Sequence, residues 1–234
     1  MKICVQTSPL IEKFGVDEAF RMLREAGFDA VDYNIDISLP YNVIVEGGHV
    51  PLYDADEEAL IEYARPVKEA GEKYGIAINQ MHAPFPCLVE NEEGNAYVME
   101  AIKRCIRVCG YLDCKYCIVH PFFLGYDKKL DPQTEWDINI ERYSQLIPFA
   151  KKYGVTCWTN VESFDRDMPW RFPPIKWEKM LWKLEQAEAA GMTDALTFEF
   201  SHFMSPHSMY PSAAGLYDRY CEYAGLPARA RDFR

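Results

Sequence analysis

The sequence predicts an α/β fold in which parallel strands alternate with helices. Extended apolar runs recur along the 234 residues, and helical patterns that end at glycines such as Gly27, Gly75 and Gly191 separate them. Neither a G-x-G-x-x-G fingerprint nor a Walker loop occurs, which argues against a mononucleotide-binding fold. We therefore expect a (β/α) barrel of the TIM type, shortened to about six recognisable βα units. No break in composition is long enough for a linker, so residues 1–234 are expected to form a single barrel-like domain.

Four strand patterns lie in the first half of the chain. Strands over 1–7 and 30–35 flank a loop over 8–14 and a helix over 16–26, which Asp17 and Glu18 begin. Residues 41–45 and 49–53 flank Gly47 and Gly48, a pattern typical of a hairpin. Acidic residues at 54–57 begin a helix that runs to residue 74 and precedes a strand over 76–81. A helix over 95–109 then leads to a strand over 116–119.

The second half contains two further units. A helix over 137–152 leads into residues 154–163, a β-branched and aromatic run typical of a buried strand. Helices over 175–190 and 211–223 then flank a strand over 195–200. A barrel of eight strands would need two more, and a sheet that does not close leaves edge strands exposed. Such edges favour a homodimer.

Charge and composition limit the partners of the chain. The net charge of −11 argues against nucleic acid or an anionic membrane and favours a neutral or cationic substrate or a bound metal ion. No apolar stretch approaches the roughly 20 residues of a membrane span, and no cleavable signal precedes the first strand. We expect a cytoplasmic protein.

The eight cysteines allow two interpretations. Cys4, Cys117 and Cys157 fall in predicted strands, where a free cysteine is a small buried apolar residue. A zinc site formed by four cysteines of the central region is the alternative, but Cys117 lies in an extended run where a zinc knuckle needs a turn. Reduced, buried thiols are the expected state. The four cysteines of the alternative are Cys105, Cys109, Cys114 and Cys117.

Histidines and carboxylates gather at the predicted carboxyl ends of the strands, where parallel α/β proteins bind their ligands. One histidine at a strand end is most often a hydrogen-bonded core residue, but a set of imidazoles and carboxylates on one rim indicates a metal or acid/base site. Nearby aromatic side chains could stack on a sugar or simply pack in the core. The polar set is His82, His120, Glu162, Glu199 and His202, and the aromatic set is Trp158, Trp170, Phe122, Phe123 and Phe203.

Three motifs in the first half resemble the xylose isomerase-like barrels, the sugar-phosphate isomerases and epimerases related to apurinic endonucleases. They are His82-Ala83-Pro84-Phe85, Cys117-Ile118-Val119-His120-Pro121 and Asn139-Ile140-Glu141-Arg142-Tyr143, and the resemblance covers about residues 1–155. It implies that Glu162 is the metal-binding carboxylate of the fifth strand and that Glu199 and His202 take the places of the aspartate and histidine of the sixth. Ser201 stands where that family has glycine, and the ligands of strands seven and eight have no counterpart here.

The second half also resembles the final two strands of certain glycoside-hydrolase-like barrels, in residues 158–164 and 197–206. If both resemblances hold, the chain is a chimera that joins two barrel segments near Val155.

Three functional hypotheses follow. The leading one is a sugar or sugar-phosphate isomerase or epimerase that moves a proton next to a carbonyl. A divalent metal (Mn, Co, Mg or Zn) would assist it, with Glu162 and Glu199 as catalytic residues. The metal ligands would be Glu162, Glu199, His82, His120 and His202. The alternatives are a glycoside hydrolase that uses Glu162 and Glu199 as its carboxylate pair, and an inactive scaffold.

Overall fold

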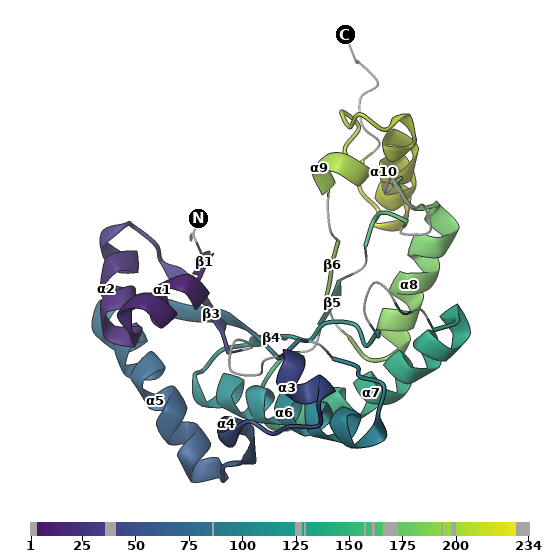
Figure 1. Ribbon diagram of the computed structural model, residues 1–234. Helices are drawn as coiled ribbons and strands as arrows, with labels where there is room; N and C mark the ends of the chain where they lie inside the picture. The colour runs from purple at the N-terminus through teal and green to yellow at the C-terminus, as the bar shows by residue number, and fades with distance from the viewer. Residues whose placement is uncertain are drawn as a thin grey trace. The chain divides into compact units, whose positions relative to one another are not determined.

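The computed structural model divides the chain into two compact units, Met1–Thr156 and Cys157–Arg234 (Figure 1). It describes residues 4–35, 41–85, 87–124, 128, 130–156, 158–160, 162–165, 173–192, 194–197 and 200–227. The division follows the contacts of the chain and does not test whether two sequences join near Val155. The single barrel-like domain likewise stays a prediction.

A parallel sheet forms the centre of the first unit. Its four strands are β1 (Cys4–Gln6), β2 (Ala30–Asn34), β3 (Ala77–His82) and β4 (Tyr116–Ile118), which pair in that order. Thr156 continues the sheet through a parallel bridge to Tyr116. Helices separate consecutive strands along the chain and cover one face of the sheet (Figure 1). The α/β class and the parallel sheet are confirmed.

Seven helices connect or cover these strands in the described part of the first unit. They are α1 (Ser8–Phe14), α2 (Val16–Glu25), α3 (Tyr41–Val45), α4 (Pro51–Asp54), α5 (Glu57–Tyr74), α6 (Glu92–Tyr111) and α7 (Pro132–Lys152). Polar side chains cap the three long helices, since Asp56, Asn91 and Asp131 accept hydrogen bonds from Ala59, Gly94 and Thr134. These caps satisfy backbone N–H groups that a helix start leaves without partners.

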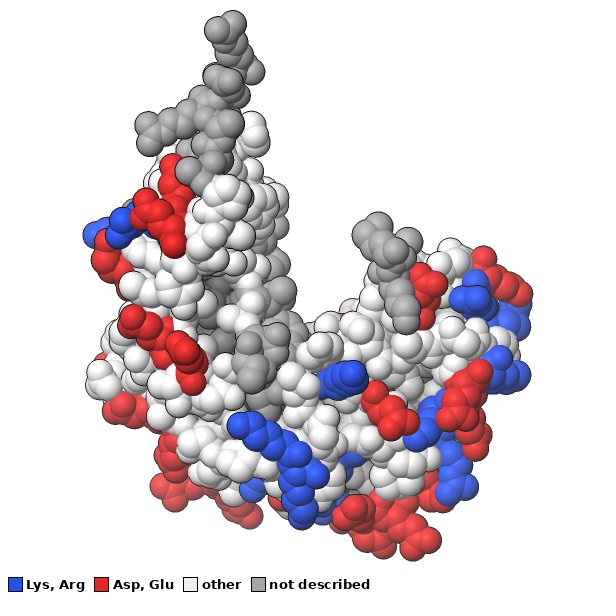
Figure 2. Space-filling view, turned by 180° about the vertical axis from the view of Figure 1, so that it is seen from behind, with Lys and Arg blue, Asp and Glu red and all other residues white. Residues whose placement is uncertain are grey.

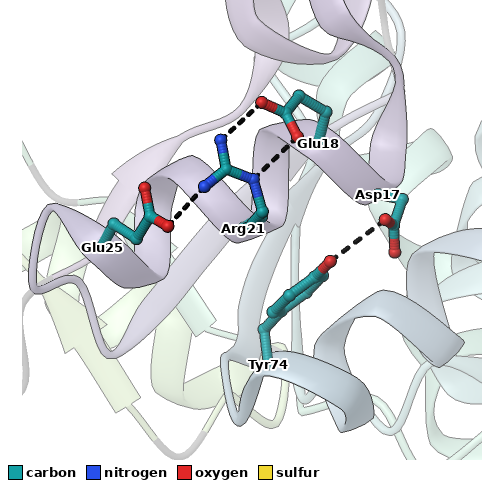
Figure 3. A network of polar contacts seen from close by, with 5 residues as sticks. All are labelled: Asp17, Glu18, Arg21, Glu25 and Tyr74. Atoms are coloured by element: carbon teal, nitrogen blue, oxygen red, sulfur yellow. Dashed lines mark hydrogen bonds and ion pairs between the residues drawn. The ribbon is translucent and has the colours of Figure 1, made fainter.

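Apolar packing and a polar network join α2 to α5. Phe20 and Leu23 of α2 are buried, as are Leu60, Ala64 and Val67 of α5. At the edge of this contact, the carboxylate of Asp17 accepts hydrogen bonds from Lys73 (2.6 Å) and Tyr74 (3.0 Å). Arg21 binds Glu18 and Glu25 on α2 itself (Figure 3). Because these charged groups are exposed, salt weakens their attraction, and the buried apolar contact carries most of the stabilisation.

The predicted hairpin over 41–53 is wrong, because this segment forms α3 and α4. Ile44 and Tyr53 are buried, and the Tyr53 hydroxyl lies 3.4 Å from the Cys105 sulfur of α6. Packing on α6 therefore overrides the local preference of the β-branched residues around Gly47 and Gly48.

Two further expectations about the first unit are wrong. Residues 8–14 form α1 rather than a loop, with a proline in the first turn where its missing N–H costs nothing. Cys4 is exposed rather than buried, because β1 is an edge strand of the described sheet. Cys117 is only partly buried, and Cys157 lies outside the described residues.

The buried-thiol expectation agrees with the structure at Cys105, Cys109 and Cys114, which are all buried and free. The Cys109 thiol donates to the carbonyl of Cys114 at 3.3 Å. Burial also raises the pKa of the Cys87 thiol to about 12.

The second unit has a pair of parallel strands, β5 (Trp158–Asn160) and β6 (Asp194–Leu196). Its described helices are α8 (Trp177–Ala189), α9 (Phe200–Phe203) and α10 (Pro211–Tyr223). The core consists of side chains from the helices and the loops beside them: Ile175, Met180, Met204 and Leu216, with Trp177, Leu184 and Tyr220 packed against them. The sixth strand is shorter than predicted, since α9 begins at Phe200.

Two helical glycines predict opposite effects of the same substitution. A Cβ atom at Gly110 of α6 would lie 2.8 Å from the backbone oxygen of Tyr153, whereas one at Gly215 of α10 would meet nothing within 4 Å. We expect Gly110→Ala to lower the free energy of unfolding by about 1–3 kcal/mol. Gly215→Ala should raise it by up to about 1 kcal/mol, because alanine favours the helix. Urea unfolding measures both, and a stabilising Gly110→Ala would contradict the packing described for α6.

The charged side chains are interspersed by sign on the face that Figure 2 shows. Ion pairs between oppositely charged side chains include Lys128–Glu90 and Lys68–Asp113. No helix in the described ranges is long and apolar enough to cross a membrane.

Candidate active site

A bulge in β3 decides which side chains share a face with β2. The register between the strands runs Ala30↔Ala77, Val31↔Ile78 and then Asp32↔Gln80. Asn79 is therefore an extra residue in β3. Because side chains alternate along a strand, one extra residue turns Gln80 and His82 to the face that Asp32 occupies.

The other face of these strands packs on the helices. Tyr33 lies close to Tyr63 of α5 and Cys105 of α6, and Met81 is fully buried. Since Asp32 and His82 alternate with these residues, both point away from the helical layer, and His82 is the last residue of β3, at the carboxyl end of the sheet. The carboxyl ends of parallel strands are where α/β proteins hold their ligands.

Asp32 is the residue around which the polar side chains assemble. Its Oδ1 lies 3.0 Å from Nδ1 of His82, and its Oδ2 accepts a 2.8 Å hydrogen bond from Nε2 of Gln80. The side chains of His82 and Asp32 are only 21% and 12% exposed. A carboxylate can only accept, so Nδ1 of His82 carries its hydrogen and neutral His82 holds its lone pair on Nε2. An imidazole held by a carboxylate in this way is a typical acid/base group.

The backbone of Asp32 is held from the neighbouring strand. The Thr7 N–H donates to the carbonyl of Asp32 at 3.1 Å, and the Thr7 hydroxyl accepts from the N–H of Asn34 at 3.3 Å. Thr7 is fully buried. Thr7 thus fixes the backbone that follows the Asp32 side chain.

His120 lies beside His82, two residues beyond the end of β4. The two ring centroids are 5.6 Å apart, and the ring of Phe85 meets His120 edge-on at 5.4 Å. Burial lowers the pKa of His120, and the neighbouring His82 lowers it further. At neutral pH His120 is therefore uncharged, which allows it to donate one hydrogen bond and accept another.

Helix α7 fixes the loop that carries His120. The Asn139 amide accepts from the N–H of Phe122 and donates to its carbonyl, both at 2.9 Å, and the guanidinium of Arg142 lies 5.0 Å from the Phe122 ring. Phe122 is fully buried, which agrees with the alternative that it packs in the core rather than stacks on a sugar. Phe123 instead lies 5.8 Å from Phe85, next to His120.

The other predicted site residues belong to the second unit. Glu162 follows β5 and is partly buried. His202 lies on α9, where Nδ1 is 3.4 Å from the hydroxyl of Ser201 and the ring is 6.0 Å from that of Phe203. Glu199 and Trp170 lie outside the described residues. The glycosidase alternative depends on the distance between Glu162 and Glu199, and it stays a prediction because Glu199 is not among the described residues.

The described residues do not by themselves fit a metal ion. Among them, no three His, Cys, Asp or Glu side chains lie close enough together to hold one. In the first unit, the carboxylate of Asp32 is instead hydrogen-bonded to Gln80 and to His82. The four cysteines of the zinc alternative are all described residues, and no three of them lie close enough together to hold a zinc ion. They are Cys105, Cys109, Cys114 and Cys117. A metal ligand set that includes Glu199 therefore stays a prediction.

Comparisons with known proteins agree on the fold. A 3-keto-D-glucoside 4-epimerase from E. coli matches with a TM-score of 0.54 and 12% identity, over 99% of this chain and 94% of that one. A proposed xylose isomerase from Rhodospirillum rubrum matches with the same score and identity, over 100% and 93%. A proposed α-L-fucosidase from Bacteroides thetaiotaomicron shares 24% identity over 96% and 80%, but its TM-score of 0.49 is too low to support a shared fold.

The chain therefore has the fold of the xylose isomerase-like TIM barrels, as the motifs around His82 and His120 predict. A family described as a domain of unknown function (DUF4434) matches residues 129–210. This match runs across Val155, so it marks no junction there, and the chimera stays a prediction. No curated protein matches the chain.

Proposed function

We propose that this chain is a carbohydrate isomerase or epimerase that moves a proton on a carbon next to a carbonyl. The observation that carries the proposal is the Asp32–His82 pair with neutral His120 beside it, on the face of the sheet that faces away from the helices. The fold supports it, because similar structures with this fold include a sugar epimerase. Glu162 and Glu199 stay proposed catalytic carboxylates.

The proposed step uses the two imidazoles in different roles. Nε2 of His82 accepts the proton of the C–H bond, and the electron pair of that bond forms the double bond of an enediolate. The carbonyl oxygen gains the negative charge, and an N–H of neutral His120 stabilises it, as a neutral imidazole can. For the isomer, His82 returns the proton to the former carbonyl carbon, His120 gives its proton to the oxygen of that carbon, and the neighbouring hydroxyl gives its proton to His120 as its carbon becomes the new carbonyl. For the epimer, a water molecule protonates the other face of the first carbon, the original carbonyl forms again, and the imidazolium of His82 neutralises the hydroxide that remains.

Asp32 contributes by holding His82 in the required state. It keeps the hydrogen on Nδ1, so that Nε2 is the basic nitrogen, and it stabilises the imidazolium that forms when the proton arrives. This step uses only side chains of the first unit. A divalent metal, predicted from the sequence, would polarise the carbonyl if it binds, and its identity as Mn, Co, Mg or Zn is part of the same prediction.

Conversion of sugars tests the proposal. The purified protein is incubated with D-fructose, D-xylulose and their phosphate esters, and chromatography follows the formation of isomers and epimers. We expect conversion of at least one of them. The metal prediction is tested in the same assay, since chelation should abolish conversion and Mn²⁺ or Co²⁺ should restore it. A protein without any bound divalent ion, whose conversion resists chelation, would contradict the metal prediction while the proton-transfer proposal stands.

A further inference from the structure

We infer that Gln80 is a positioning residue, which acts through Asp32 to keep the hydrogen of His82 on Nδ1. The effect on turnover rests on the proposed function, but the effect on the state of His82 does not. Gln80 touches neither a reacting atom nor His82 in the contacts described above; it donates from Nε2 to Oδ2 of Asp32 at 2.8 Å.

The two oxygens of Asp32 face different side chains. Oδ1 faces Nδ1 of His82 at 3.0 Å and Oδ2 faces the Gln80 amide, so each oxygen has its own donor. A carboxylate cannot donate, and it therefore selects the N–H side of the Gln80 amide rather than its oxygen. Two donors on different oxygens fix the rotation of the carboxylate about its last torsion angle, which is otherwise broad.

Burial makes this arrangement energetically significant. The Asp32 side chain is 12% exposed, so water replaces a lost donor poorly, and hydrogen bonds to charged groups contribute more than neutral ones. Without the Gln80 donor, the carboxylate is free to turn and the directed acceptor at Nδ1 of His82 is weakened. His82 then gains access to the tautomer with its hydrogen on Nε2, in which the nitrogen required for proton abstraction is no longer basic.

The bulge at Asn79 places Gln80 and His82 on the same face of the sheet as Asp32. In an uninterrupted register Asn79, not Gln80, would pair with Asp32, and Gln80 and His82 would both turn toward the helices. The extra residue therefore brings the donor and the imidazole to the carboxylate together. Bulges that redirect side chains in this manner are frequent beside active sites.

The test is the tautomer of His82, read from the ¹⁵N chemical shifts of Nδ1 and Nε2 in protein labelled with ¹⁵N-histidine. His82→Asn assigns the signals. In the unmodified protein we expect the Nδ1–H tautomer. In Gln80→Leu the ratio of the tautomers should move by about tenfold toward Nε2–H. Gln80→Met, which nearly keeps the length of the side chain but removes the donor, gives a second measurement if Gln80→Leu does not fold.

Gln133→Leu is the matched control, because Gln133 donates from Nε2 to Asp137 at the same 2.8 Å on the exposed surface of α7. It should leave the His82 signals unchanged. If both Gln80 variants retain the His82 signals of the unmodified protein, the inference is overturned, whatever their turnover. If the tautomer shifts but the unmodified protein converts no sugar, the proposed function fails and the positioning role of Gln80 stands.

Discussion

Asp32→Asn is expected to lower the rate of proton transfer by about 100- to 10,000-fold, the range that positioned acid/base groups contribute. The amide of asparagine can donate to Nδ1 of His82, which then becomes the acceptor and moves the ring hydrogen to Nε2. The asparagine also lacks the negative charge that stabilises the imidazolium. The fold should persist, because the two side chains have nearly the same shape. Circular dichroism checks the fold, and the conversion assay measures the rate.

The structure offers a matched control for this substitution. Asp54 lies 3.0 Å from Nδ1 of His49, the same separation as in the Asp32–His82 pair, but both side chains are exposed. Asp54→Asn should therefore leave the rate of conversion unchanged. Equal losses in the two variants would show that the effect is not specific to His82, and an unchanged rate in Asp32→Asn would refute its role.

The second large effect concerns His120 and pH. Burial and His82 place the pKa of His120 below its ordinary value of 6.5. The rate should decline as the pH falls, because His82 must be unprotonated to accept the proton and His120 must stay neutral, and the part of the decline that belongs to His120 should appear only at its lowered pKa, below about 6.5. His120→Leu, which removes the donor to the carbonyl oxygen, should lower the rate by about 100- to 1,000-fold. Rates across the pH range measure both effects.

Protonation of His120 should also change the free energy of unfolding. The unfolded state binds more protons at His120 than the folded state between the lowered pKa and about 6.5, so the free energy of unfolding falls as the pH falls through this window. His120→Leu should remove this part of the decline. Urea unfolding at about pH 7.5 and at lower pH values measures the difference between the two proteins. An equal decline in both would show that the pKa of His120 is not lowered.

The positions of His82 at a strand end and of His120 just beyond one could be predicted from the sequence, because both follow short apolar runs between helical patterns. Residues 211–223 were likewise expected to form a helix, and α10 has these limits. Such elements follow from local periodicity and capping. The segment 41–53 could not be predicted in this way, because the burial of Ile44 and Tyr53 depends on α6, which lies far along the chain.

Asp32 and Gln80 could not be predicted as site residues for a different reason. An aspartate inside the strand Ala30–Asn34 is a recognisable signal, since charged residues are rarely buried without a partner. Its partner, however, depends on the register of β3, and the extra residue at Asn79 changes which side chains face it. No pattern in a single sequence shows where such a bulge falls. The hydrogen bonds that organise the candidate site therefore emerge only from the strand pairing.

Deuterium incorporation from D₂O tests the central claim most directly, namely that the Asp32–His82 pair moves a carbon-bound proton. NMR follows the C–H signals next to the carbonyl of the sugars used in the conversion assay. We predict loss of one such signal with the unmodified protein and with Asp54→Asn, and retention of it with Asp32→Asn. Exchange that continues at the same rate in Asp32→Asn, or conversion without any exchange in the unmodified protein, would contradict the claim.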